Sequence, residues 1–204
     1  MNLDEIRRAK PDHAIQNLVA KRWSPYAFSD RPVSESELRS LFEAARWAAS
    51  SYNEQPWSYI VATKAEPEAH AKLVRCLNEG NRLWAAAAPV LAIGCVTRNF
   101  KLNGKPNAAA EHDLGAASCS LTFEASARGL YVHQMIGILP DEVRREFGVP
   151  DDVDPKTGIA IGYVGDPANL PEKLQDRDGT PKPRKPLAEF VFGPAWGTAS
   201  PLVK

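Results

Sequence analysis

Two cations and a hydroxyl group stand close together early in the chain, in the segment KRWSPYAF over residues 21–28. The guanidinium of Arg22 offers a planar fork of N–H donors, and the hydroxyl of Ser24 adds a further donor. This combination suits a phosphate group. A solvated loop before a turn has the same composition, and the segment taken alone favours that simpler interpretation.

Hydroxyl and amide side chains gather in a second segment, ASSYNEQPW over residues 49–57. The amides of Asn53 and Gln55 carry both donors and acceptors, which suits recognition of the polar edge of a heterocycle such as an isoalloxazine. A helix C-cap and turn, with Pro56 leading into a strand, explains the same residues equally well.

A third segment, KPRKPL over residues 182–187, carries basic side chains between prolines. Prolines stiffen an extended chain and hold its basic groups in place. The segment therefore predicts either a second phosphate clamp or a solvated C-terminal tail.

Motifs that supply their own chemistry are missing from the sequence. No GxGxxG follows a strand, and there is no P-loop, GxSxG elbow or HExxH. The four histidines are scattered: His13, His70, His112 and His133. Three cysteines without a CxxC pair argue against a disulfide framework or a zinc site, and we expect Cys95 and Cys119 to be buried, inert thiols. An enzyme built from this sequence takes its reactive group from a cofactor.

Together the three segments resemble motifs of the nitroreductase family, over about Val19 to Gly193. The family pattern R-R/H-S-x-R/K-x-F corresponds to RWSPYAF here, and K-x-R-x-P-L corresponds to KPRKPL. The pattern S/P-S-x-N-x-Q-P-W matches SSYNEQPW and is the most specific of the three. The motif sequences RWSPYAF and YVHQM resemble those of a branch of the family that includes flavin reductases of desulfurisation systems.

The resemblance implies FMN as cofactor and NADH or NADPH as co-substrate. In relatives the basic residues of the first and third motifs meet the FMN phosphate, and the backbone of a segment corresponding to residues 133–137 lies along the flavin ring. The flavin-binding residues that it implies are Arg22, Trp23, Ser24, Tyr26, Ser50, Ser51, Asn53, Gln55, Asn81, Gln134, Met135, Ile136, Gly137, Lys182 and Arg184. Trp23 and Tyr26 stand where many relatives carry basic residues, so positive charge is lost near the ring or ribityl chain.

The implied activity is ping-pong electron transfer from NAD(P)H to a small-molecule acceptor, such as a nitroaromatic, a quinone or free flavin. No catalytic side chain is needed, because hydride transfer depends on stacking and orientation. The alternative is a flavin-binding or flavin-supplying protein with little turnover of its own.

The elements that must position these residues follow from the hydrophobic pattern. A capping box at Ser34 and Glu37 predicts the start of a helix that runs to about Ala48. The other predicted elements are a helix over 3–20 broken near Pro11, a strand over 57–63, a helix from Pro67 that stops at Gly80, a strand over 89–97, a loop over 98–107, a helix over 108–128, a helix over 141–147, and strands over 159–164 and 189–192.

This mixture without regular alternation predicts an α+β fold. The resemblance implies a three-layer fold with a central mixed or antiparallel sheet flanked by helices, in an intertwined homodimer with a swapped C-terminal strand. The 204 residues would form a single domain in which residues 165–204 are an arm that reaches the partner. The small-residue helix over 108–128 would make the dimer contact, and Ser51 and Asn53 would serve a site with Arg22 of the other chain.

Composition and charge bear on the partners and the location of the protein. Equal numbers of basic and acidic residues, 25 each, give no net charge, which argues against a nucleic-acid partner. The N-terminus lacks the pattern of a signal peptide, and the apolar run Trp84 to Val96 is too short to span a bilayer. We therefore expect a cytoplasmic protein without a membrane partner.

Overall fold

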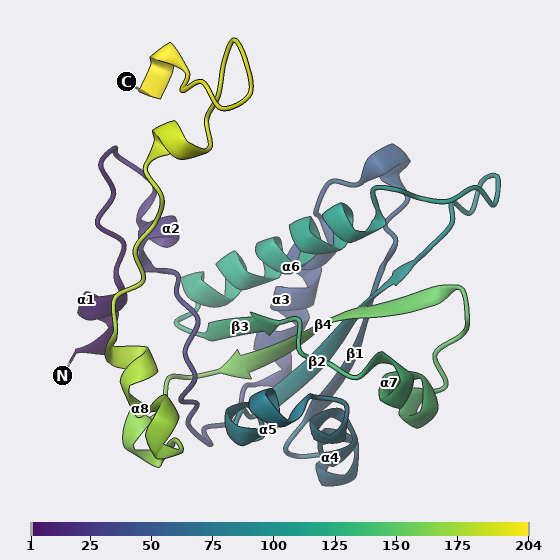
Figure 1. The fold of residues 1–204 in the computed structure, drawn as a ribbon. Helices are drawn as coiled ribbons and strands as arrows, with labels where there is room; N and C mark the ends of the chain where they lie inside the picture. The colour runs from purple at the N-terminus through teal and green to yellow at the C-terminus, as the bar shows by residue number, and fades with distance from the viewer. Residues whose placement is uncertain (1, 204) are drawn as a thin grey trace.

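A four-stranded antiparallel sheet in the order β1-β2-β4-β3 forms the centre of the computed structural model, which describes residues 2–203 (Figure 1). The strands are β1 (Trp57–Thr63), β2 (Val90–Thr97), β3 (Tyr131–Met135) and β4 (Val153–Gly162). The inner strand β2 is buried along almost its whole length, since helices cover both faces of the sheet. Strand β3 pairs only with β4, so its other edge is open.

One helical layer consists of α3 (Glu35–Arg46) and α6 (Ala110–Ala127). Leu41 of α3 and Leu121 of α6 are fully buried against Ile159 and Ile161 of β4. The predicted capping box is confirmed: the Ser34 hydroxyl accepts from the Glu37 amide at 3.2 Å, and the Glu37 carboxylate accepts from the Ser34 amide at 2.9 Å.

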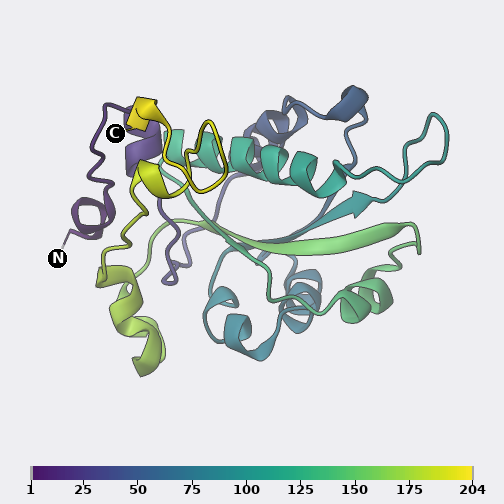
Figure 2. The ribbon, with the colours of Figure 1, turned by 45° about the horizontal axis from the view of Figure 1, so that its top comes forward.

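The second layer covers the other face of the sheet, as Figure 2 shows. It contains α4 (Pro67–Arg75), α5 (Glu79–Ala85) and α7 (Pro140–Phe147), with α8 (Glu172–Gly179) at the side of β3. Leu73, Leu77 and Trp84 are buried in this half of the core. The predicted α+β, three-layer architecture is thus confirmed, and the sheet is antiparallel throughout.

Several predicted boundaries were wrong. Residues 3–20 form two short helices, α1 (Leu3–Arg7) and α2 (Asn17–Lys21), because the chain around Pro11 is not helical. Gly80 does not end α4 but lies in the first turn of α5, where the Asn78 side chain caps the helix by accepting from the Asn81 amide at 2.9 Å. Strand β4 begins at Val153 instead of Ile159, and β3 was not predicted as a strand.

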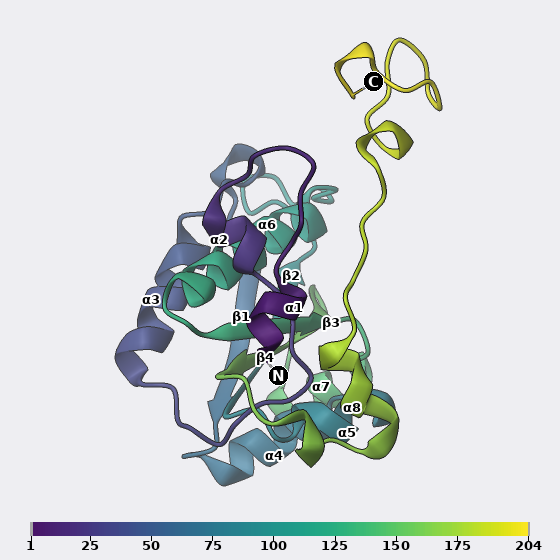
Figure 3. The ribbon, with the colours of Figure 1, turned by 90° about the vertical axis from the view of Figure 1, so that its left-hand side faces the viewer.

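The C-terminal arm also differs from the prediction. Residues 165–186 contain a 3-10 turn (Pro167–Asn169) and α8 before the extended part. Residues 189–192 form no strand: Leu187–Glu189 is a 3-10 turn, and Phe192 makes only an isolated bridge to Ala199. A strand needs a neighbour to pair with, and this segment projects away from the body of the same chain (Figure 3).

The three cysteines occupy two environments. Cys76 and Cys95 are buried, and burial raises the pKa of each thiol to about 11. Cys119 is exposed on α6, so its predicted burial was wrong. It lies on the outer face of the helix with Gly115 and Phe123, four residues away on either side, whereas Ala117 and Leu121 face the sheet.

Replacing Leu121 with Ala is expected to lower the free energy of unfolding by about 2–5 kcal/mol, because it leaves a cavity between α6 and the sheet. Urea denaturation followed by circular dichroism measures the change. The matched control is Leu102→Ala, at a side chain that is 91% exposed, which should change stability by less than about 0.5 kcal/mol. Equal losses in both variants would contradict this description of the core.

Candidate functional site

The segment over residues 22–28 runs beside strand β3 and is fixed there by its backbone. The His133 imidazole donates from Nδ1 to the carbonyl of Pro25 at 2.8 Å. The Ala27 carbonyl accepts from the Gly165 amide at 2.9 Å, and Phe28 bridges Val164 just beyond β4. This pairing carries Arg22 and Ser24 to the open edge of the sheet.

Positive charge accumulates at this edge. Arg22 donates to the Ser24 hydroxyl at 3.3 Å, and its pKa is lowered by burial and then by the charge of Arg184. The pKa of Arg7 is also lowered, first by burial, and Arg184 contributes again. Within residues 2–203 neither these three arginines nor Lys182 forms an ion pair with a carboxylate. The arrangement therefore suits a bound anion.

Arg7 was missed by the sequence analysis. Its guanidinium stacks on the Trp23 ring at 5.1 Å and reaches Arg184 only because α1 folds against the segment over residues 22–28. Trp23 itself is buried, and its indole donates to the Asp4 carboxylate at 2.9 Å. Any contact of Trp23 with a ligand at this edge would be made through its backbone.

Asn81 and Gly137, distant in sequence, meet where β3 ends. The Asn81 amide donates to the Gly137 carbonyl at 3.0 Å, and so does the backbone amide of Asn78. A Cβ atom on Gly137 would lie 2.6 Å from Nδ2 of Asn81 and closer still to Nδ2 of Asn78, so both hydrogen-bonded side chains would have to move. The close approach explains why residue 137 is glycine.

The residues before Gly137 alternate along the strand. Gln134 turns toward α6, where its amide donates to the Ser118 carbonyl at 3.2 Å and the Thr122 hydroxyl at 3.0 Å. Met135 is buried, and Ile136 is 89% exposed. The segment thus offers its backbone and one apolar side chain to the space beside the sheet edge.

His133, Tyr26 and Trp84 form an aromatic cluster on the opposite face of β3. The His133 ring lies 4.8 Å from the Tyr26 ring and 4.4 Å from the Trp84 ring, measured between centroids. Burial lowers the pKa of His133, and its Nδ1 proton is held by the Pro25 carbonyl. Tyr26 is therefore part of the packing that supports Arg22 and Ser24.

The second motif forms a strained loop. Tyr52, Asn53 and Gln55 have positive φ angles of 53°, 56° and 52°, although none is glycine. Such backbone costs about 1–3 kcal/mol per residue and clusters at functional sites. The Ser51 amide donates to the Asp113 carboxylate at 3.0 Å, and the Gln55 amide donates to the Ser50 hydroxyl at 3.0 Å.

Within one chain the strained loop and the cations lie apart. The loop is tied to Asp113 in the first turn of α6, whereas α2 and the segment over residues 22–28 lie toward the C-terminal end of that helix (Figures 1 and 2). The structure therefore separates Arg22 and Ser24 from the strained loop that holds Ser50, Ser51, Asn53 and Gln55, and it places Asn81 with Gly137 where β3 ends.

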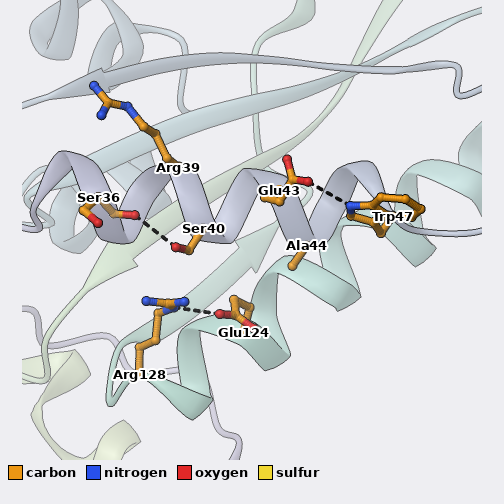
Figure 4. A pocket seen from close by; sticks show the side chains of 8 residues that line it. All are labelled: Ser36, Arg39, Ser40, Glu43, Ala44, Trp47, Glu124 and Arg128. Atoms are coloured by element: carbon orange, nitrogen blue, oxygen red, sulfur yellow. Dashed lines mark hydrogen bonds and ion pairs between the residues drawn. The ribbon is translucent and has the colours of Figure 1, made fainter.

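A groove lies between α3 and α6, away from these residues (Figure 4). Its lining residues are Ser36, Arg39, Ser40, Glu43, Ala44, Trp47, Glu124 and Arg128. Its charged groups satisfy one another: Arg128 pairs with Glu124 at 2.7 Å, and the Trp47 indole donates to Glu43 at 2.8 Å. None of the predicted flavin-binding residues lines it.

The described part of the chain, residues 2–203, lacks two further features. No helix there is long and apolar enough to cross a membrane. No group of three or more His, Cys, Asp or Glu side chains is arranged there to hold a metal ion.

Comparison with known proteins gives the family. The model of the nitroreductase family matches residues 19–163. A Mycolicibacterium smegmatis relative, the "Uncharacterized 15.4 kDa protein in ask 5'region", is 37% identical over 135 residues, which are 65% of this chain and 88% of the relative. A Streptomyces coelicolor relative with the name "Putative NADH dehydrogenase/NAD(P)H nitroreductase" is 28% identical over 180 residues, 78% of this chain and 90% of the relative.

A solved structure described as "the oxidoreductase containing FMN" superposes with a TM-score of 0.86 and 34% identity, over 92% of this chain and 95% of that one. The chain therefore belongs to the nitroreductase family. The family and the oxidoreductase class predicted from the three motifs are confirmed.

Proposed function

We propose that this protein binds FMN, oxidises NADH or NADPH, and passes the electrons to a small-molecule acceptor. The observation that carries the proposal is the cluster of Arg7, Arg22 and Arg184, none of which forms an ion pair with a carboxylate in the described chain. The bound flavin would supply the capacity to take up and release hydride and electrons, and the protein would supply binding and orientation.

The donor set fits the phosphate of FMN. Arg22 and Ser24 form one side of the proposed clamp, and Lys182 and Arg184 on the arm form the other. Arginine and phosphate pair through two parallel charge-assisted hydrogen bonds, which are stronger than neutral ones. Burial lowers the pKa of Arg22 most, and repulsion from Arg184 lowers it further; a phosphate here would relieve that repulsion.

The end of β3 fits the flavin ring. Since Nδ2 of Asn81 is committed to the Gly137 carbonyl, its Oδ1 faces away and can accept from an N–H group on the polar edge of the ring. Gln134, Met135 and Gly137 present backbone along this edge, and the exposed Ile136 offers an apolar surface.

A second chain would complete the site. Ser50, Ser51, Asn53 and Gln55 belong to the loop tied to the first turn of α6, whereas the segment over residues 22–28 lies toward the other end of that helix. We propose that these four residues contact the flavin held by the partner in an intertwined homodimer. The arm over residues 165–204 would reach the partner. Its exposed apolar side chains include Phe190, Trp196 and Leu202, which are 56%, 93% and 92% exposed in the single chain. Contact with the partner chain would bury them.

No side chain of the site is arranged as an acid or a base. His133 holds its proton against the Pro25 carbonyl, and burial disfavours a second one. Hydride transfer needs stacking and orientation, so NAD(P)H and the acceptor can use the same surface in turn, in a ping-pong sequence. Nitroaromatics, quinones and free flavins are flat enough to stack there.

Anaerobic addition of NADH or NADPH to the FMN-loaded protein is expected to bleach the flavin absorbance. Flavin colour that persists would identify the alternative, a flavin-binding or flavin-supplying protein with little turnover. A protein that cannot be loaded with FMN would contradict both.

Arg184→Gln should raise the Kd for FMN about tenfold or more, since it removes a charge-assisted contact. The control Lys173→Gln, on the exposed face of α8, should leave the Kd unchanged.

Gly115→Arg is expected to convert a dimer into a monomer and to remove FMN binding. A Cβ atom at Gly115 meets nothing within 4 Å in the single chain, so the substitution leaves the monomer intact but blocks a close contact through α6. Light scattering should give twice 22.3 kDa for the wild type and 22.3 kDa for the variant. Glu68→Arg, exposed on α4, is the control that should stay dimeric. A wild-type monomer that retains FMN would contradict the two-chain site.

A further inference from the structure

Asp178 is a fully buried carboxylate at the end of α8, with 0% of its surface exposed. It accepts from the backbone amide of Tyr26 with both oxygens, at 2.9 and 3.0 Å, and from the amide of Ala27 at 2.8 Å. A buried charge is costly unless hydrogen bonds satisfy it, and these bonds join two segments about 150 residues apart in sequence.

Neighbouring contacts strengthen the same junction. Arg177 donates to the Tyr26 hydroxyl at 3.2 Å and lies over its ring at 5.4 Å. Arg7 donates to the carbonyls of Arg177 and Thr180, at 3.2 and 2.5 Å. The end of α8 is therefore held both to α1 and to the segment over residues 22–28.

The junction is also the last attachment of the arm. Among the described residues, 181–203 make hydrogen bonds only with one another and none with the rest of the chain. Lys182 and Arg184 follow Asp178 by four and six residues. The position of Arg184 near Arg22 thus depends on where the arm leaves α8, and Asp178 fixes that point.

We propose that Asp178 is a positioning residue that holds the two halves of the phosphate clamp, Arg22 with Ser24 and Lys182 with Arg184, in register with each other. This inference rests on the proposed FMN function. The negative charge of Asp178 acts on the nearby Arg7 guanidinium and offsets part of the repulsion between Arg7 and Arg184. Asp178 itself touches neither ligand nor reacting atoms.

Asp178→Asn tests this role, because an amide puts a donor where two backbone donors converge. Titration by flavin fluorescence should show a Kd for FMN raised about tenfold or more. The Kd for riboflavin, which lacks the phosphate, should change less than about threefold. Asp176→Asn, an exposed position on the same helix, is the matched control and should leave both values unchanged.

A loss of equal size for FMN and riboflavin would overturn the proposal, since it would indicate a general structural role, and so would an unchanged FMN Kd. If Asp178→Asn does not fold, Asp178→Glu keeps the charge but displaces the carboxylate, and the same selective loss of FMN is expected. Combined with Arg184→Gln, the two losses should be less than multiplicative, because both act through one clamp. A wild type that binds no FMN would refute the proposed function as well, whereas an unaffected Asp178→Asn refutes only the inference.

Discussion

Electrostatic repulsion among Arg7, Arg22 and Arg184 is the constraint on which the proposed site depends. Three cations are brought together from α1, from the segment after α2 and from the arm, and burial of the Arg7 and Arg22 guanidinium groups adds a loss of solvation to this repulsion. Part of the repulsion is offset because the negative charge of the buried Asp178 acts on Arg7 and because Arg184 remains exposed to solvent. An anion that bridges the arginines would convert the repulsion into binding energy.

The sheet and its helices make this concentration of charge possible. The edge strand β3 is open, so the segment over residues 22–28 can lie beside it, and Gly137 lets Asn81 close the end of the strand. The strained loop at Tyr52 and Asn53 is fixed at the other end of α6. Binding groups that lie apart within one chain suit a site assembled from two copies of that chain.

Local sequence signals predicted much of this and failed where contacts are distant. The Ser34 capping box and the strand Trp57–Thr63 could be predicted because their causes lie within a few residues. Gly80 wrongly predicted the end of a helix, because the Asn78 side chain caps α5 and a single glycine in its first turn does not stop that helix. Arg7 and Asp178 were missed because their roles arise only when the two ends of the chain meet, and no short motif marks them.

Complementation between two defective chains tests the shared site most directly. Arg22→Gln and Asn53→Ala are each expected to lose tight FMN binding alone. If Arg22 of one chain and Asn53 of the other serve the same flavin, a purified heterodimer of the two variants contains one intact site and binds one FMN with wild-type affinity. If both residues of one chain serve the same flavin, every site in the heterodimer is defective. Absence of any wild-type site would then contradict the account.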